Sequence, residues 1–173
     1  MLKIFNDLEP FFNDNYRRIN VREYARIRKI SPPSASSRLH EFHKEGLLNK
    51  EEERKYMYFY ANRDDMVFIR LSRIYWYLQL KKVGLIDYLQ KELINPLIIL
   101  FGSFSKAEIK DDSDIDIAVL TPSEKRINPI HIALWENQLK HKIHIFNLPV
   151  PKYGKNKELI NNISNGFIIS GNW

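Results

Sequence analysis

Two aspartates separated by a single residue, with a Gly-Ser pair ten residues ahead of them, are the part of this chain best equipped for chemistry. Asp114 and Asp116 bracket Ile115, so on a strand, where side chains alternate between faces, both carboxylates leave the same face. Carboxylate oxygens are the ligands that Mg²⁺ prefers in proteins, and substrate phosphates commonly complete its coordination. The pair therefore predicts a magnesium site that also binds a phosphorylated ligand.

The Gly-Ser pair follows a stretch that predicts a buried strand. Residues 97–101 are an uncharged apolar run, and Gly102 and Ser103 end it where a helix can begin. A turn and helix start would present backbone N–H groups and the positive helix end to a phosphate. With the aspartates, this predicts a site for a metal-bound nucleoside triphosphate. An ordinary buried strand followed by an Asp-rich turn is the alternative.

The same segment resembles the signature of the polymerase-beta-like nucleotidyltransferases, whose minimal members carry an apolar residue, Gly, Ser, a spacer and Asp-x-Asp. Gly102-Ser103 and Asp114-Ile115-Asp116 match that pattern, whereas Ala107 stands where a glycine is usual. The resemblance implies that Gly102 and Ser103 bind the triphosphate, ATP first among the candidates. It implies that Asp114 and Asp116 are catalytic and bind Mg²⁺ for nucleotidyl transfer to an acceptor hydroxyl. A protein or an RNA would supply that hydroxyl.

The third carboxylate of the catalytic family is not evident in this chain. Residues 142–148 alternate as a strand should, and the position flanked by Ile143 and Ile145 is His144. Imidazole is a poorer magnesium ligand than a carboxylate. Glu136, in the helical stretch before this strand, is expected to be a solvated surface residue. An active transferase and a catalytically degenerate nucleotide-binding domain therefore both stay open.

The C-terminal stretch predicts a closing helix and strand. Residues 157–165 place Leu159, Ile160 and Ile163 at helical spacing, Gly166 follows as a C-cap, and 167–169 form a short apolar run. This arrangement looks like the end of many minimal nucleotidyltransferase domains.

The first sixty residues predict two helices and a hairpin. Residues 21–30 are a helical stretch, and Ser31 with Pro32 is typical of the start of the next helix. Over residues 34–45 three apolar side chains share one helical face, namely Ala35, Leu39 and Phe42. The charged stretch 49–55 and the aromatic run 56–60 predict the strands and tip of a β-hairpin.

The sequence ISPPSASSRLHEFHKEGLL resembles the recognition-helix region of winged helix-turn-helix domains, and the match covers roughly residues 17–63. Arg28 and Lys29 depart from it, because an apolar residue and a glycine are more usual there. The resemblance implies duplex DNA as a partner. The DNA-binding residues it implies lie on the recognition helix and the wing: Ser34, Ser37, Arg38, Lys50, Arg54 and Lys55. A small helical subdomain that contacts protein or RNA is the alternative.

The charge distribution favours a nucleic-acid partner for this half of the chain. Residues 16–44 hold eight Lys and Arg against two Glu, a net charge of +6 that equals the formal excess of the whole chain. Residues 96–173 are nearly balanced, with nine basic and eight acidic side chains. A concentrated basic patch is the feature expected of a surface that contacts phosphate backbones.

The sequence thus predicts an α+β protein: a winged helix-turn-helix domain at 1–63, a helical linker at 64–94, and a small mixed-sheet nucleotidyltransferase domain flanked by helices at 95–173. In the linker, residues 64–80 form a helix with one apolar stripe, made of Val67, Leu71, Ile74 and Leu78. That stripe would join the domains, join a second subunit in a homodimer, or complete the core.

The composition removes several classes of protein. The chain has no cysteine, which excludes disulfides and thiolate metal sites. No apolar run approaches the ~20 residues of a membrane span, and the start lacks the apolar core of a signal peptide, so a cytoplasmic protein without membrane partners is expected. The function predicted is transfer of a nucleotidyl group from a magnesium-bound nucleoside triphosphate. The alternative is a DNA-binding transcriptional regulator or antitoxin-like protein with a degenerate nucleotidyltransferase domain.

Overall fold

The structure is a computed structural model and describes residues 2–123, 127–149 and 157–171. The chain divides into two compact units. Met1–Ser72 with Ala107–Asp111 form the N-terminal unit, and Arg73–Lys106 with Asp112–Trp173 form the C-terminal unit. Helix α4 (Met66–Lys82) begins in the first unit and ends in the second. The domain boundaries expected at residues 63 and 94 stay a prediction.

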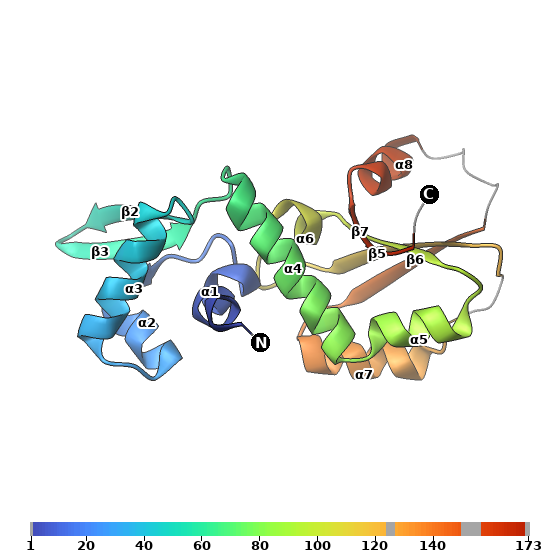
Figure 1. Cartoon of the computed structure of the whole chain (residues 1–173), viewed down its shortest axis with the longest axis horizontal. Coiled ribbons are helices and arrows are strands. Elements are labelled where there is room, and N and C mark those ends of the chain that lie inside the picture. The colour runs from blue at the N-terminus through green and yellow to red at the C-terminus, as the bar shows by residue number, and fades with distance from the viewer. Residues whose placement is uncertain (1, 124–126, 150–156, 172–173) are drawn as a thin grey trace. The chain divides into compact units, whose positions relative to one another are not determined.

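The N-terminal unit combines helices with a small antiparallel sheet (Figure 1). Its strands lie in the order β1-β3-β2, and β2 pairs with β3 from Leu48 opposite Ala61 to Glu53 opposite Tyr56. The hairpin predicted from the charged and aromatic runs is therefore confirmed. In chain order the elements are α1 (Lys3–Asn13), β1 (Ile19–Asn20), α2 (Val21–Arg28), α3 (Pro32–Lys44), β2 (Leu48–Glu53) and β3 (Tyr56–Ala61).

Helix α3 begins and packs as its sequence predicts. The Ser31 hydroxyl accepts the backbone N–H of Ser34 at 3.4 Å, and Pro32 occupies the first helical position, where its missing N–H costs nothing. The three residues predicted on the inner face are buried: Ala35, Leu39 and Phe42.

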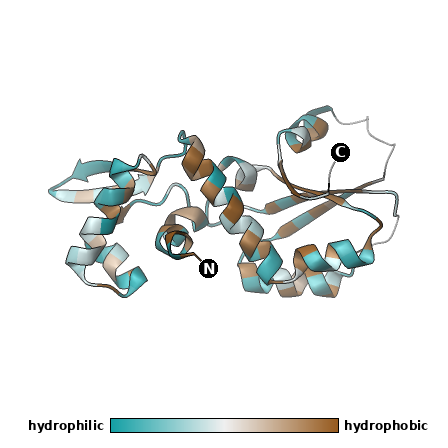
Figure 2. Cartoon of the chain, viewed as in Figure 1, coloured by the Kyte–Doolittle hydropathy of each residue, from teal (hydrophilic) through white to brown (hydrophobic). Residues whose placement is uncertain are grey.

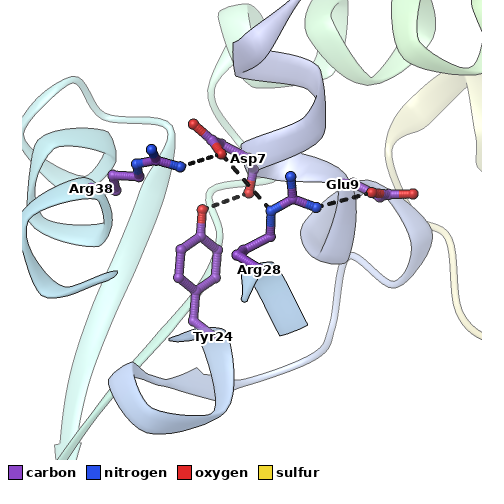
Figure 3. A network of polar contacts seen from close by, with 5 residues as sticks. All are labelled: Asp7, Glu9, Tyr24, Arg28 and Arg38. Atoms are coloured by element: carbon purple, nitrogen blue, oxygen red, sulfur yellow. Dashed lines mark hydrogen bonds and ion pairs between the residues drawn. The ribbon is translucent and has the colours of Figure 1, made fainter. Parts of the chain in front are cut away.

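A buried carboxylate ties α1 to the two helices that follow it (Figure 3). Asp7 on α1 accepts Arg38 Nη1 of α3 at 2.6 Å, and Arg28 Nε of α2 lies 3.9 Å from the same oxygen. The Tyr24 hydroxyl donates to the Asp7 carbonyl at 2.8 Å, and burial, with Asp7 next in effect, raises the pKa of Tyr24 to about 12. Since Asp7 is 5% exposed, its charge depends on these partners for compensation.

The C-terminal unit is built on a mixed sheet, as expected from the sequence. Its strands lie in the order β6-β5-β4-β7, with β5 and β6 parallel and the other neighbours antiparallel. With the second part of α4, its elements are α5 (Leu85–Glu92), β4 (Leu97–Phe101), α6 (Ser103–Lys106), β5 (Ile115–Thr121), α7 (Pro129–Leu139), β6 (Ile143–Pro149), α8 (Lys157–Ser164) and β7 (Phe167–Ser170). The closing helix and strand predicted at 157–169 are thus present.

Helices cover both faces of this sheet (Figure 1). In the figure α8 lies on one side of the strands, and α5 and α7 lie on the other. Ile163 of α8 packs on one face with side chains of β4 and β5, namely Leu97, Ile99, Phe101, Ala118 and Leu120. Because side chains alternate along a strand, Asp116 leaves β5 on this same face, two residues before Ala118.

The apolar stripe predicted on α4 is not the buried face of the helix, and its role in joining the domains or a second subunit stays a prediction. Val67 is 57% exposed and Ile74 is 41% exposed, whereas the buried positions are Phe68, Ser72, Tyr75, Trp76 and Leu80. Figure 2 shows hydrophobic and hydrophilic residues alternating along this helix. With apolar residues on several sides, helical spacing alone does not select the buried one.

Among the described residues, no helix combines the length and the apolar character needed to span a membrane.

Candidate nucleotide and metal site

The two aspartates lie at the start of β5, as the spacing predicted. Ile115 and Ile117 are fully buried, while Asp114 and Asp116 are partly exposed. Their side chains keep 39% and 26% of their exposure, respectively. The alternation of the strand therefore sends the apolar side chains into the core and leaves both carboxylates reachable from solvent.

Gly102 directly follows β4 and lies beside Asp116. Phe101 is the register partner of Asp116, and Gly102 follows it with a φ of +67°, a conformation that residues with a side chain rarely adopt. A Cβ at position 102 would lie 2.5 Å from Asp116 Oδ2 and 3.4 Å from its Cγ. The glycine is thus required both by its backbone conformation and by the carboxylate packed on it.

The segment after Gly102 is a single helical turn. Helix α6 has four residues, so the helix dipole expected to attract a phosphate is much smaller than a long helix would supply. Ser103 is partly exposed at its start. The Ser105 hydroxyl donates to the Gly102 carbonyl at 2.9 Å, and Arg73 Nε donates to the Ser105 carbonyl at 2.6 Å. These bonds fix the turn on which Gly102 and Ser103 lie.

Ala107 follows this turn with a left-handed backbone. Its φ is +55° and its side chain is fully buried. This is the position where the resembling family usually carries glycine. An alanine in that conformation costs roughly 1–2 kcal/mol, and the surrounding packing must supply it.

His144 lies on β6 at the position expected for a third carboxylate. It is the register partner of Asp116 on the neighbouring parallel strand β5. His144 Nδ1 lies 3.5 Å from Asp116 Oδ1, and Nε2 lies 3.9 Å from Asp114 Oδ2. Its side chain is 52% exposed. The structure therefore gathers two carboxylates and one imidazole on neighbouring strands, next to Gly102.

The surroundings of Asp116 shift the pKa of its carboxyl group in opposite directions. Burial raises the pKa of Asp116, the nearby His144 lowers it, and the Asp114 charge raises it slightly. The net effect is a pKa above the ordinary value of an aspartate.

The described residues contain no group of three or more His, Asp or Glu side chains placed to hold a metal ion. Asp114 and Asp116 supply two oxygen-bearing side chains on one face, which fits a hard divalent cation whose other ligands are water and phosphate oxygens. His144 does not extend that set, because its nitrogens suit borderline metals better than magnesium.

Two residues that position the site were missed or misjudged from the sequence. Glu136, expected to be solvated, accepts the backbone N–H of Ile143 at 2.9 Å and so fixes the start of β6 one residue before His144. His141 Nδ1 donates to the Ser113 carbonyl at 2.8 Å, and its ring packs edge-on against Trp76 and Phe104. A glutamate near the end of a helix, or a histidine just before a strand, is only a weak sequence signal that the side chain hydrogen-bonds backbone groups next to the site.

The residues predicted to bind DNA are not alike in their surroundings. Five of them are exposed, namely Ser34, Ser37, Lys50, Arg54 and Lys55. Arg54 and Lys55 form the hairpin tip with φ values of +49° and +68°. Arg38 instead points to α1, where it pairs with the buried Asp7. Its role as a DNA-contacting residue stays a prediction.

Residues 84–169 match the family model of polymerase beta, nucleotidyltransferase. This part of the chain, which includes Gly102, Asp114, Asp116 and His144, is therefore a nucleotidyltransferase domain of the polymerase beta type. Among solved structures, the chain is similar to one described as "Crystal structure of the toxin-antitoxin with AMP-PNP". The identity is 22% and the TM-score 0.39, over 56% of this chain and 73% of that chain. A search of curated proteins finds no match.

Proposed function

We propose that this protein transfers a nucleotidyl group from a magnesium-bound nucleoside triphosphate, ATP first among the candidates, to the hydroxyl of a protein or RNA acceptor. The observation that carries the proposal is the contact between Gly102 and Asp116, with Asp114 on the same strand face. A backbone without a side chain next to paired carboxylates is the arrangement that a triphosphate and its metal require.

Each residue has a defined part in this proposal. Gly102 and Ser103 bind the triphosphate through the turn that Ser105 braces. Asp114 and Asp116 hold Mg²⁺, which when bound would neutralise phosphate charge and stabilise the departing pyrophosphate. His144 lies within reach of both carboxylates and of solvent, so it is the candidate to accept the proton of the acceptor hydroxyl.

We also propose that the N-terminal unit is a winged helix domain that binds duplex DNA. The order α1-β1-α2-α3-β2-β3 and the sheet order β1-β3-β2 support this assignment, as does the basic segment 16–44. In that arrangement α3 enters the major groove and the β2–β3 hairpin is the wing. The proposed contacts are Ser34, Ser37, Arg38, Lys50, Arg54 and Lys55.

A second candidate function is a DNA-binding regulator or antitoxin-like protein whose nucleotidyltransferase domain binds nucleotide without turning it over. One observation favours it. His144 stands beside Asp116 where the catalytic pattern calls for a third carboxylate.

Calorimetry and a pyrophosphate-release assay on the same preparation separate these candidates. Replacing Asp114 and Asp116 together with Asn keeps their shape and removes their charge, so magnesium-dependent ATP affinity should fall substantially. Equal affinity of the two proteins for ATP and Mg²⁺ would remove the site assignment. ATP binding by the wild type with no pyrophosphate released, in the presence of cell lysate as a source of acceptors, would favour the regulator.

A further inference from the structure

The arginines of the basic segment 16–44 fall into two groups, those that pair with acidic side chains and those that do not. Within the basic segment 16–44, four arginines pair with carboxylates: Arg17 with Glu23, Arg18 with Glu51 and Glu53, and Arg28 and Arg38 with Asp7. Arg22 and Arg26 form no ion pair with any described residue. Of the six arginines in this segment, the two without an acidic partner among the described residues both lie on α2.

Arg22 and Arg26 share one face of that helix. They lie four residues apart, so their side chains emerge one above the other, and both are exposed. Like charges at this spacing repel and disfavour the helix, which is the arrangement expected where a ligand supplies the opposite charge. The two side chains border a hollow whose other lining residues are Ala25, Ile30 and Pro32.

The hollow offers an anion no backbone donor from the start of α3. Pro32 and Pro33 have no N–H, and the Ser34 N–H already donates to the Ser31 hydroxyl. An anion there would be held by the two guanidinium groups. Guanidinium is planar, always charged and matched to phosphate oxygens through paired N–H donors.

The wing offers less attraction to an anion than α2 does. Lys50, Arg54 and Lys55 are matched in number by Glu51, Glu52 and Glu53 on the same hairpin. Over its own residues the hairpin is therefore neutral, whereas α2 carries Arg22, Arg26 and Arg28 against one acid, Glu23.

We propose that Arg22 and Arg26 clamp a phosphate of the duplex DNA backbone. This inference rests on the DNA-binding part of the proposed function and adds two residues that are not among the DNA contacts proposed there. Pro32 lines the hollow two residues before Ser34, the first exposed serine of α3 proposed to face DNA. A phosphate held on α2 would therefore set the register in which α3 meets the base edges.

The test measures the salt dependence of duplex binding by the full chain, using fluorescence anisotropy. Each phosphate contact adds about 0.9 to the slope of log affinity against log salt. Because the two arginines share one phosphate, Arg22→Ala with Arg26→Ala should lower that slope by about 0.9 and weaken binding several-fold near physiological salt. The matched control is Arg17→Ala with Arg18→Ala, which removes the same charge from two exposed arginines that already have acidic partners.

The control should change the slope much less, and Arg22→Lys with Arg26→Lys should restore most of it, because lysine keeps the charge. Equal loss of slope in the two alanine variants would overturn the inference in favour of general charge attraction. No change in the Arg22 and Arg26 variant, with the wild type binding DNA, would also overturn it and leave the proposed DNA binding intact. Tighter binding to single-stranded RNA, lost in the same variant, would assign the clamp to RNA instead. Absence of nucleic-acid binding at low salt would remove the proposed function of the unit together with the clamp.

Discussion

The carboxylate of Asp116 lies against the backbone of Gly102, so closely that a Cβ at residue 102 would come within 2.5 Å of Asp116 Oδ2. Gly102 directly follows β4, whose last residue Phe101 pairs with Asp116 on the antiparallel strand β5, so the turn after β4 lies next to the paired aspartates. A ligand held by both elements would contact the chain at two places far apart in sequence.

Gly102→Ala should abolish ATP binding, because the new methyl group must displace the Asp116 carboxylate from its position. Calorimetry measures the binding, and circular dichroism checks the fold. Gly84→Ala is the matched control: Gly84 has a similar φ of +82°, and a Cβ there would meet no atom within 4 Å. It should cost a comparable backbone strain, about 1 kcal/mol, and leave ATP affinity unchanged. If both variants bind ATP equally well, Gly102 is not at the nucleotide site.

The environment of Asp116 predicts a pH dependence of stability. Since burial raises its folded-state pKa above the unfolded value, the folded state binds the proton more tightly. Stability therefore falls as pH rises through the raised pKa, and Asp116→Asn should raise the melting temperature at pH 7 in the absence of metal. That gain should shrink as the pH is lowered toward the ordinary aspartate range. A melting temperature that falls at pH 7 would show that the contact with His144 outweighs burial.

His144→Asp should tighten magnesium binding, because it places a third carboxylate beside Asp116 on the neighbouring strand. The same change should lower the stability of the metal-free protein, because three carboxylates repel one another, and Mg²⁺ should restore it. Melting curves with and without Mg²⁺ measure both effects. His144→Asn is the control of equal size without the charge and should show neither. Magnesium affinity that is unchanged in the Asp variant would place the metal away from β6.

At two positions where the resembling families usually carry glycine, this chain has another residue, and both of these residues adopt a left-handed backbone conformation. Lys29 and Ala107 stand where glycine is usual in the two resembling families, and both have left-handed φ values, +53° and +55°. Ala107→Gly should therefore stabilise the protein by about 1 kcal/mol, the relief of strain being partly offset by greater freedom of the unfolded chain. Urea denaturation measures the change. The buried Ala118, on the regular strand β5, is the control: Ala118→Gly should destabilise.

Local patterns in the sequence were sufficient to predict the strands of the site and helix α3. The alternation around Ile115 and Ile143 indicated which side chains share a face of β5 and of β6, since each strand has one face that must be buried. The pairing of the two strands and their register come from the structure. Helix α4 could not be oriented in this way, because its apolar residues surround the helix. Contacts between distant segments could not be predicted from the sequence either. Asp7 and Arg38 are 31 residues apart, and nothing in the spacing around either residue indicates the other.

That pair leads to the last prediction, because Arg38 cannot at once be held by Asp7 and contact a base with the same N–H group. Asp7 is 5% exposed, so Arg38→Ala leaves a buried carboxylate with Arg28 Nε at 3.9 Å as its nearest remaining cation. The variant should lose about 2 kcal/mol of unfolding free energy, a rough value for removing one partner of a largely buried pair. Arg17→Ala, which breaks an exposed pair, should cost less than about 1 kcal/mol.

Asp7→Asn combined with Arg38→Ala should cost less than the sum of the two single changes, since both remove the same interaction. A stable Arg38→Ala protein that discriminates less between a selected DNA site and a random duplex, by roughly 1–3 kcal/mol, would instead make Arg38 a base-reading residue.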